Sequence, residues 1–313
     1  MTPPAAATAP SAAVFDAVIL AALAEDSPWG DITCQGLIAP SVLATGAVTA
    51  REAGVFCGAQ VIESAMRLTD PRITMEPQLS DGDAFAPGAV LATLSGPAAG
   101  ILAAERTALN LTQRLSGIAT LTARYVEAVR GTGARIVDTR KTTPGLRALE
   151  KYAVRCGGGF NHRFSLSDAV LVKDNHLALL SADGPKALTA ALAEARVRLP
   201  HTVHFEVEVD RLDQIEPVLA AGVDTILLDN FSLAELAEGV RRVGGRALVE
   251  ASGNVTLETV AAIAATGVDL ISSGALTHSV RSLDLGLDFR PEAPGYVGAG
   301  ATAGARLPAE LRS

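Results

Sequence analysis

The segment from Arg130 to His176 carries the side chains best suited to binding a small anion. It holds nine basic residues against four acidic ones, whereas the whole 313-residue chain has a formal net charge of −8. Cations concentrated in one segment of an acidic protein indicate a site for a carboxylate or a phosphate. A solvated basic surface is the alternative interpretation of the same charges.

Five side chains of this segment form a candidate cationic wall. They are Arg140, Lys141, His162, Arg163 and Lys173. Guanidinium groups bind carboxylates and phosphates through two parallel hydrogen bonds, and lysine supplies a movable point charge. Taken singly, each of these cations could instead form a structural ion pair with Asp138, Asp168 or Asp174.

Two carboxylates and two glycine-containing turns farther along the chain add complementary chemistry. Glu208 and Asp229 follow separate apolar runs, and carboxylates without clustered Cys or His favour a hard cation such as Mg²⁺. The alternative for each carboxylate is helix capping or neutralisation of the cationic wall. The turns Ser252-Gly253 and Ser273-Gly274 each stand between an apolar run and a helical pattern, where backbone N–H groups can hold a phosphate.

These residues require a fold that brings distant strand ends together. After Gly131, six short apolar runs alternate with helical patterns, at 135–139, 169–174, 203–210, 224–230, 247–252 and 269–274. Such alternation predicts a parallel sheet covered by helices, and six units favour a closed or nearly closed α/β barrel. Polar residues follow every run, so we expect one shared active site at the carboxyl ends of the strands. A doubly wound open sheet is the alternative.

The first part of the chain has a different pattern. A helix over 14–25, with Ser11 as its cap, precedes strand-like runs at 45–50, 73–79 and 90–94, which predict a small antiparallel sheet with helices on one face. A long helix follows from Ala98 to about Arg130, interrupted at Ser116-Gly117. Arg106 and Arg114 on this helix are expected at the surface.

Composition excludes several other classes of protein. The sequence pI of about 5.2 argues against nucleic acid and anionic membranes as partners. No apolar stretch reaches the length of a membrane span, and the Ala- and Pro-rich start does not resemble a signal peptide. Three widely spaced cysteines without a Cys-x-x-Cys pair argue against a disulfide framework and against a zinc site, which fits a cytoplasmic protein.

Residues 138–176, DTRKTTPGLRALEKYAVRCGGGFNHRFSLSDAVLVKDNH, closely resemble the characteristic motif of the quinolinate phosphoribosyltransferase family. Further similar stretches are EDSPWGDIT, ERTALNLTQRLSGIAT, FEVEVD, LLDNF, EASGN and SGALTHS. The resemblance implies an N-terminal α/β sandwich and a C-terminal incomplete, six-stranded α/β barrel. Its implied division is a disordered tail at 1–12, the sandwich at 13–116 completed by 280–313, and the catalytic barrel at 117–279.

The resemblance also implies substrates and residue roles. Such enzymes transfer a phosphoribosyl group from phosphoribosyl pyrophosphate to quinolinate with Mg²⁺, releasing pyrophosphate and CO₂ and forming nicotinate mononucleotide for NAD biosynthesis. Arg140, His162, Arg163 and Lys173 would bind the quinolinate carboxylates, Lys141 the pyrophosphate side, and Glu208 and Asp229 the metal and ribose. Residues at the two turns would surround the 5-phosphate, namely Ser252, Gly253, Ser273, Gly274 and His278. Lys141, Lys173, Glu208 and Asp229 are thus the expected catalytic residues.

The resemblance reverses the surface assignment of Arg106, because the family supplies this arginine to the neighbouring subunit's site. A homodimer or higher homo-oligomer is therefore implied. Arg147, Lys151 and Arg155 are left as surface or interface charges. The alternatives are a related phosphoribosyltransferase (a nicotinate-specific enzyme or a molybdenum-associated relative), a non-catalytic metabolite-binding protein, and a metal-dependent aldolase-type barrel.

Overall fold

The structure, a computed structural model, describes residues 8–180 and 184–290. Part of the expected tail (1–7) and part of the segment expected to complete the sandwich (291–313) lie outside the described residues. No helix within the described ranges is long and apolar enough to cross a membrane.

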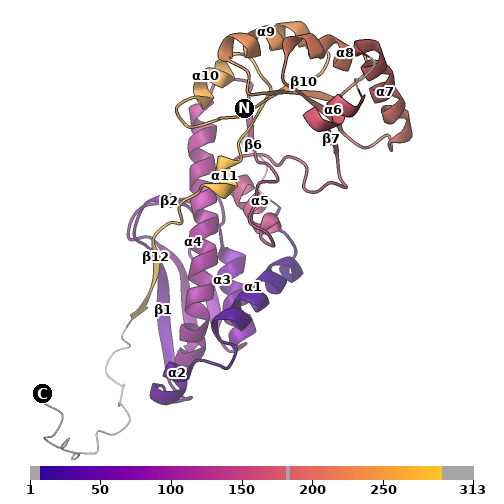
Figure 1. Ribbon diagram of the computed structural model, residues 1–313. Coiled ribbons are helices and arrows are strands. Elements are labelled where there is room, and N and C mark those ends of the chain that lie inside the picture. Colours follow the sequence, from indigo (N-terminus) through magenta and orange to yellow (C-terminus); the bar gives the residue numbers. More distant parts are fainter. Residues whose placement is uncertain (1–7, 181–183, 291–313) are drawn as a thin grey trace, which may run out of the picture.

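A four-stranded antiparallel sheet forms the first part of the fold, in the order β12-β1-β5-β3. Its strands are β1 (Leu43–Ala50), β3 (Thr74–Pro77), β5 (Val90–Pro97) and β12 (Leu285–Arg290). β12 returns from the far end of the chain and pairs with β1, so Figure 1 shows the last strand beside the first. A separate two-stranded ribbon joins β2 (Gly54–Val55) to β4 (Ala84–Phe85).

Three helices accompany this sheet: α1 (Ala12–Asp26), α2 (Ile32–Leu37) and α3 (Ala59–Thr69). Phe15 and Ile19 of α1 are buried in the same core as Ile62 of α3. Ser11 occupies the N-cap position of α1 as predicted, although its side chain makes no capping hydrogen bond. The carboxylate of Asp31 does cap a helix, because it accepts hydrogen bonds from Thr33 and Cys34 at the start of α2.

The helix α4 (Ala98–Ala128) runs without interruption from the sheet to the second part of the molecule (Figure 1). The predicted break at Ser116-Gly117 is therefore wrong. Ser116 hydrogen-bonds to the backbone of Cys57, and a Cβ at Gly117 would lie 2.3 Å from the carbonyl oxygen of Arg281. These two residues are small because other chain segments cross the helix there.

We predict that Gly117→Ala destabilises the protein by about 1 to 3 kcal/mol, because the methyl group would displace the backbone at Arg281. Urea denaturation measures this loss. Gly36→Ala is the matched control, since Gly36 is also helical but has open space around it. The control should raise stability by up to about 1 kcal/mol, and an equally stable Gly117→Ala variant would contradict the steric argument.

The second part is a six-stranded parallel sheet in the order β6-β11-β10-β9-β8-β7. The strands are β6 (Arg135–Val137), β7 (Val170–Val172), β8 (Phe205–Val209), β9 (Thr225–Asp229), β10 (Leu248–Ser252) and β11 (Leu270–Ser272). The first strand pairs with the last, and the others follow in chain order. That order is cyclic, as in a barrel, and lacks the reversal of a doubly wound sheet. The predicted incomplete barrel is thus confirmed.

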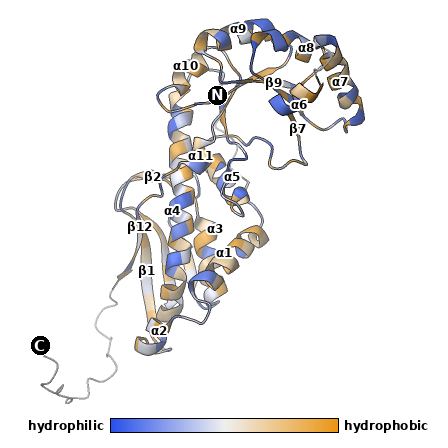
Figure 2. Ribbon diagram, in the orientation of Figure 1, coloured by the Kyte–Doolittle hydropathy of each residue, from blue (hydrophilic) through white to orange (hydrophobic). Residues whose placement is uncertain are grey.

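Helices cover the outside of this barrel. They are α5 (Arg147–Cys156), α6 (Asp174–Leu180), α7 (Pro185–Arg198), α8 (Ile215–Leu219, after a 3₁₀ turn at Leu212–Gln214), α9 (Leu233–Val243), α10 (Val260–Ala265) and α11 (Ala275–His278). Hydrophobic residues concentrate on the strands, while the outer helices carry hydrophilic ones (Figure 2). Ile226 and Leu228 of β9 illustrate the buried outward-facing positions against these helices.

The barrel is open between β6 and β7, where the described strands do not pair with each other. The segment after α5 lies along the open edge of β6. Phe160 forms a parallel bridge with Val137, donating its N–H to Ile136 and accepting one from Asp138. The glycine-rich segment therefore continues into a short extended piece that places His162 and Arg163 at the opening.

Candidate active site

A cavity of about 410 Å³ occupies the carboxyl-terminal mouth of the barrel. The structure brings eight of the predicted site residues to its wall, namely Arg140, Lys141, His162, Arg163, Lys173, Glu208, Asp229 and Ser252. Thr139 and Ser272 also line it. Side chains separated by up to 133 positions in the sequence, Thr139 and Ser272, thus share one chamber because parallel strands end at the same edge.

The two arginines of the cationic wall are not neutralised by acidic side chains. Within residues 8–180 and 184–290, Arg140 and Arg163 form no ion pair, and the buried Nε of Arg140 has no hydrogen-bond partner. Burial, and then the neighbouring Arg140, lower the pKa of Arg163. Two adjacent guanidinium groups that remain uncompensated favour an anionic ligand over a structural ion pair.

Two carboxylates face this wall from adjacent strands. Glu208 near the end of β8 accepts a hydrogen bond from Lys173 Nζ at 2.6 Å, and Asp229 at the end of β9 accepts one from the Asn230 amide at 2.7 Å. Both carboxylates line the cavity. Their oxygen chemistry and their position beside the cations fit a hard divalent cation that is shared with a substrate phosphate.

The two predicted turns are placed differently. Gly253 has φ +91°, and a Cβ there would lie 2.2 Å from the side-chain oxygen of Asn230, so only glycine fits. Gly274 lies against Lys141 and His278, since a Cβ at this position would contact both side chains within 2.9 Å. Gly253, Gly274 and His278 therefore flank the cavity without lining it.

Ser273 is not brought into the cavity. It is buried, its hydroxyl donates to the carbonyl oxygen of Val255, and Ser272 lines the cavity instead. Side chains alternate along a strand, so Leu270 and Ser272 of β11 point inward while Ile271 and Ser273 point outward. Arg106 also lies outside the cavity, exposed on α4.

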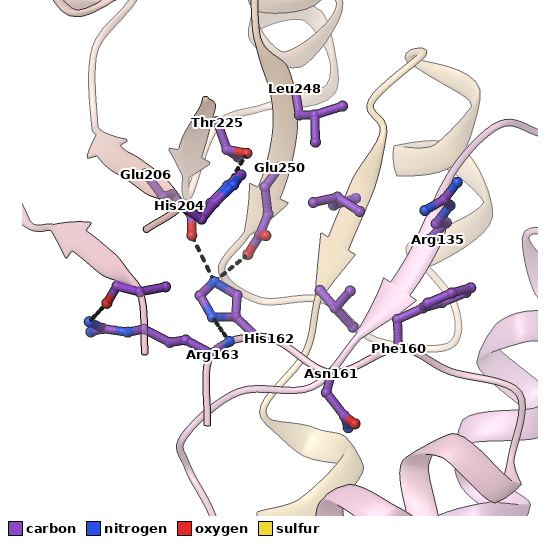
Figure 3. A pocket seen from close by; sticks show the side chains of 13 residues that line it. Arg135, Phe160, Asn161, His162, Arg163, His204, Glu206, Thr225, Leu248 and Glu250 are labelled. Carbon is purple, nitrogen blue, oxygen red and sulfur yellow. Dashed lines mark hydrogen bonds and ion pairs between the residues drawn. The ribbon is translucent and has the colours of Figure 1, made fainter. Parts of the chain in front are cut away.

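Two glutamates inside the barrel were not among the predicted site residues. Glu206 and Glu250 are almost fully buried, and His162 Nε2 lies 2.9 Å from Glu206 and 3.8 Å from Glu250 (Figure 3). The ring's Nδ1 accepts the N–H of Arg163 at 2.7 Å. Strand alternation could have found both acids, because each stands two residues before an inward-pointing residue, Glu208 or Ser252.

The burial of these groups changes their protonation. Burial opposes the charge of His162, but its hydrogen bond to Glu206 and the charge of Glu250 outweigh burial and raise its pKa. Burial and the neighbouring Glu206 raise the pKa of Glu250 to about 8. At neutral pH Glu250 therefore holds a proton in the folded protein, whereas the same carboxyl is ionised in the unfolded chain.

We predict that Glu250→Gln flattens the dependence of stability on pH. Between the carboxyl's unfolded pKa and about 8, the folded wild type binds the extra proton, so its stability falls as pH rises. Glutamine mimics the protonated acid and removes up to about 1.4 kcal/mol per pH unit from this slope. Urea unfolding across this range measures the slope, and the exposed Glu25→Gln should keep the wild-type value. An unchanged slope in Glu250→Gln would show that Glu250 is ionised in the folded state.

Several charges assigned to the surface have structural partners. Arg114 donates to the buried Glu150, to Thr143 and to the carbonyl of Thr277, so it joins α4 to the site loops. Lys151 is buried against Asp138. The surface assignment of both is therefore wrong, because their partners come from distant segments. Arg147 bonds the carbonyls of Arg140 and Phe164, and Arg155 bonds that of Gly159.

The fold is an α/β barrel whose mouth places two arginines without ion-pair partners beside two carboxylates, with glycine turns at its rim. Such a site suits a protein that binds small carboxylated and phosphorylated compounds. Comparison with known families gives the particular one. Residues 31–116 match the N-terminal domain of quinolinate phosphoribosyl transferase, and residues 118–288 match its C-terminal domain. The chain belongs to the quinolinate phosphoribosyltransferase family.

Individual relatives agree with this assignment. The nicotinate-nucleotide pyrophosphorylase (carboxylating) of Mycobacterium leprae is 46% identical over 288 residues, which cover 88% of this chain and 98% of the relative. A probable enzyme of the same name from Bacillus subtilis is 42% identical over 264 residues, covering 84% and 89%. The solved structure of nicotinate-nucleotide pyrophosphorylase from Francisella tularensis has a TM-score of 0.84 at 37% identity, covering 91% and 99% of the two chains.

Proposed function

We propose that this chain transfers the phosphoribosyl group of phosphoribosyl pyrophosphate to quinolinate with loss of CO₂, forming nicotinate mononucleotide and pyrophosphate. Membership of the family supports the reaction. The observation that carries the substrate choice is the pair of uncompensated guanidinium groups, Arg140 and Arg163, in a cavity that also contains Lys173. Quinolinate has two adjacent carboxylates, and this group of cations provides a partner for each.

In the proposed complex, the two carboxylates would be bound by Arg140, His162, Arg163 and Lys173, which all line the cavity. The ring orientation of His162 is set by Glu206 and Glu250, which its Nε2 faces inside the barrel. Lys141, whose side chain lies against Gly274, would meet the departing pyrophosphate. Ser252, Gly253, Gly274 and His278 would surround the 5-phosphate through hydroxyl, imidazole and backbone N–H groups.

We further propose Mg²⁺ as the cofactor, held by Glu208 and Asp229 together with substrate oxygens. When bound, the ion supplies positive charge that stabilises the leaving pyrophosphate. Glu208 is hydrogen-bonded to Lys173 in this structure. Lys173 would therefore be released toward a quinolinate carboxylate when Glu208 turns to the metal and the ribose.

The chemistry of the reacting atoms follows from this placement. The ribose gains oxocarbenium character as the bond to pyrophosphate breaks, and Lys141 stabilises the departing charge. The pyridine nitrogen of quinolinate then attacks the anomeric carbon. Once quaternised, the positively charged nitrogen stabilises the electron pair that departing CO₂ leaves on C2, and protonation of C2 then completes nicotinate mononucleotide. The cations must hold both carboxylates without fixing the departing one too tightly.

A homodimer or higher homo-oligomer, with Arg106 donated across the subunit interface, completes the proposal. Arg106 is exposed on α4 and lies outside the cavity of its own chain. Because Arg106 lies outside the cavity of its own chain, it can contribute to substrate binding only at the site of another subunit.

The decisive assay supplies quinolinate, phosphoribosyl pyrophosphate and Mg²⁺ to the purified chain and follows nicotinate mononucleotide and CO₂. Stoichiometric formation of both products is expected, together with loss of activity when Mg²⁺ is chelated and recovery when it is restored. Nicotinate in place of quinolinate is the matched control. Product from nicotinate but none from quinolinate would overturn the proposal in favour of a nicotinate-specific relative.

A further inference from the structure

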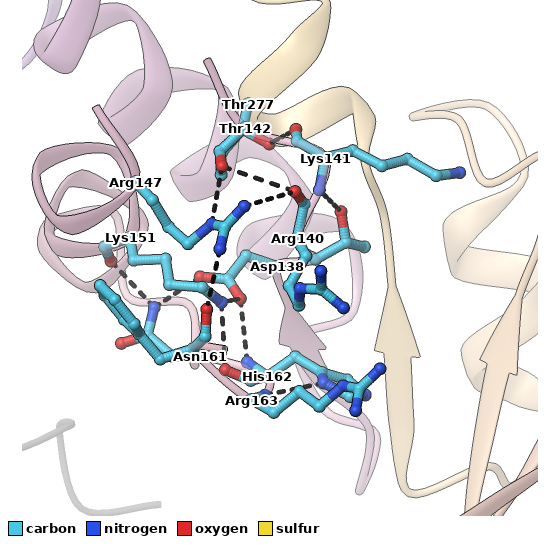
Figure 4. A network of polar contacts seen from close by, with 12 residues as sticks. Asp138, Arg140, Lys141, Thr142, Arg147, Lys151, Asn161, His162, Arg163 and Thr277 are labelled. Atoms are coloured by element: carbon cyan, nitrogen blue, oxygen red, sulfur yellow. Dashed lines mark hydrogen bonds and ion pairs between the residues drawn. The ribbon is translucent and has the colours of Figure 1, made fainter. Parts of the chain in front are cut away.

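We propose that Asp138, Lys151 and Asn161 are positioning residues that hold His162 and Arg163 in the geometry required to bind quinolinate. This inference rests on the proposed function. None of the three acts on the substrate directly in the proposed complex, and they come from three separate elements. Figure 4 shows the three side chains converging beside the backbone of His162.

The carboxylate of Asp138 is the centre of this cluster. It directly follows β6 and is fully buried. Its Oδ1 accepts hydrogen bonds from Lys151 Nζ and from the backbone N–H of His162, the latter at 2.9 Å. Its Oδ2 accepts the side-chain amide of Asn161 at 2.6 Å. One carboxylate thus joins α5 to two successive residues of the site segment.

Lys151 and Asn161 close the cluster from the other side. Lys151 Nζ also donates to the carbonyl oxygen of His162 at 3.0 Å, and the Asn161 amide donates to the carbonyl oxygen of Lys151 at 2.9 Å. The backbone of His162 is therefore bound at both its N–H and its C=O by one ion pair. This anchoring of the main chain lets the His162 ring reach Glu206. It also places the next residue, Arg163, at the mouth of the barrel.

Strand pairing alone does not hold this segment in place. It crosses the opening of the barrel between β6 and β7, and it follows three consecutive glycines, of which Gly158 has φ +84°. On this side of β6, pairing consists of one isolated bridge, between Val137 and Phe160. The cluster of Asp138, Lys151 and Asn161 begins where that pairing ends, so it replaces the hydrogen bonds of a closed barrel.

Stability alone does not explain a buried ion pair at this position. Burial raises the pKa of Asp138 and lowers that of Lys151, so each charge is unfavourable without the other. A buried ion pair of this kind is often no more stable than well-packed apolar side chains. Apolar side chains could not, however, accept the N–H of His162, the amide of Asn161 and a lysine at one point.

The test compares binding of the two substrates in purified full-length variants. Asn161→Ala removes the amide without leaving a buried charge, and Lys151→Met removes the cation. We expect each to raise the KM and Kd for quinolinate by about 10- to 100-fold, since misplacing a binding group by about 1 Å has effects of that size. The KM for phosphoribosyl pyrophosphate should stay within about twofold of wild type. Lys186→Met on the exposed surface of α7 is the matched control and should change neither constant.

Each outcome has a distinct meaning. Equal weakening of both substrates, or an unchanged quinolinate constant in Asn161→Ala, would assign the cluster to folding alone and overturn the inference. If Lys151→Met fails to fold, Asn161→Ala and Asn161→Ser still decide the question, because this side chain is partly exposed. Failure of the wild type to use quinolinate would instead refute the proposed function, and is recognised before any variant is measured.

Discussion

Replacing Arg140 by alanine should lower kcat/KM for quinolinate by roughly 30- to 5000-fold, corresponding to about 2 to 5 kcal/mol of lost transition-state stabilisation. The large effect is expected because the Arg140 Nε is buried and has no hydrogen-bond partner among the described residues. A guanidinium in that state is positioned for a ligand carboxylate. Steady-state kinetics with quinolinate varied at saturating phosphoribosyl pyrophosphate measure the change.

Two further variants separate binding geometry from charge. Arg140→Lys keeps the charge but loses the planar fork, so it should recover only part of the activity. Arg198→Ala removes an exposed arginine on α7 whose ion pair with Glu194 lies on the surface, and it should leave kcat/KM unchanged. Wild-type kcat/KM in Arg140→Ala would remove Arg140 from the site.

Chains carrying Arg106→Ala and chains carrying Lys173→Ala should each be nearly inactive as homodimers, yet regain activity when mixed. If Arg106 serves the neighbouring subunit, a mixed dimer contains one site with both residues intact and one site with neither. Random reassociation at equal amounts should then restore about one quarter of wild-type activity. Mixing after reversible dissociation, followed by assay and sizing of the mixture, measures the recovery.

The same experiment tests whether the residues act within one chain. If Arg106 and Lys173 served the same subunit's site, each mixed dimer would hold two damaged sites and no activity would return. Mixing Arg140→Ala with Lys173→Ala is the matched control, because both residues line one cavity of one chain. That pair should show no recovery, and recovery there would contradict the assignment of both residues to a single cavity.

The sequence could predict the barrel and most of its mouth because both depend on local patterns. Six short apolar runs, the last three of which start 22 to 23 residues apart, predict strands that alternate with helices. Parallel strands must end at one edge, so the sequence predicted that Arg140, Lys173, Glu208 and Asp229 share one site. Gly117 shows the limit of such patterns. Glycine within a helical pattern indicated a break, but the residue is required by the crossing of Arg281, which is distant in sequence.

The tertiary structure alone decided which charges are buried and which atoms they meet. Lys151 and Arg114 are residue types that usually lie at the surface, and only their contacts with Asp138 and Glu150 show that they have structural roles. Arg114 also reaches Thr277, 163 positions away. Sequence periodicity fixes which face of a helix or strand a side chain occupies, whereas a buried ion pair depends on the packing of two elements that periodicity does not relate. The basic segment that first indicated an anion site therefore has two parts. Arg140, Lys141, Arg163 and Lys173 line the cavity, whereas Lys151 pairs with Asp138 and holds the neighbouring chain in place.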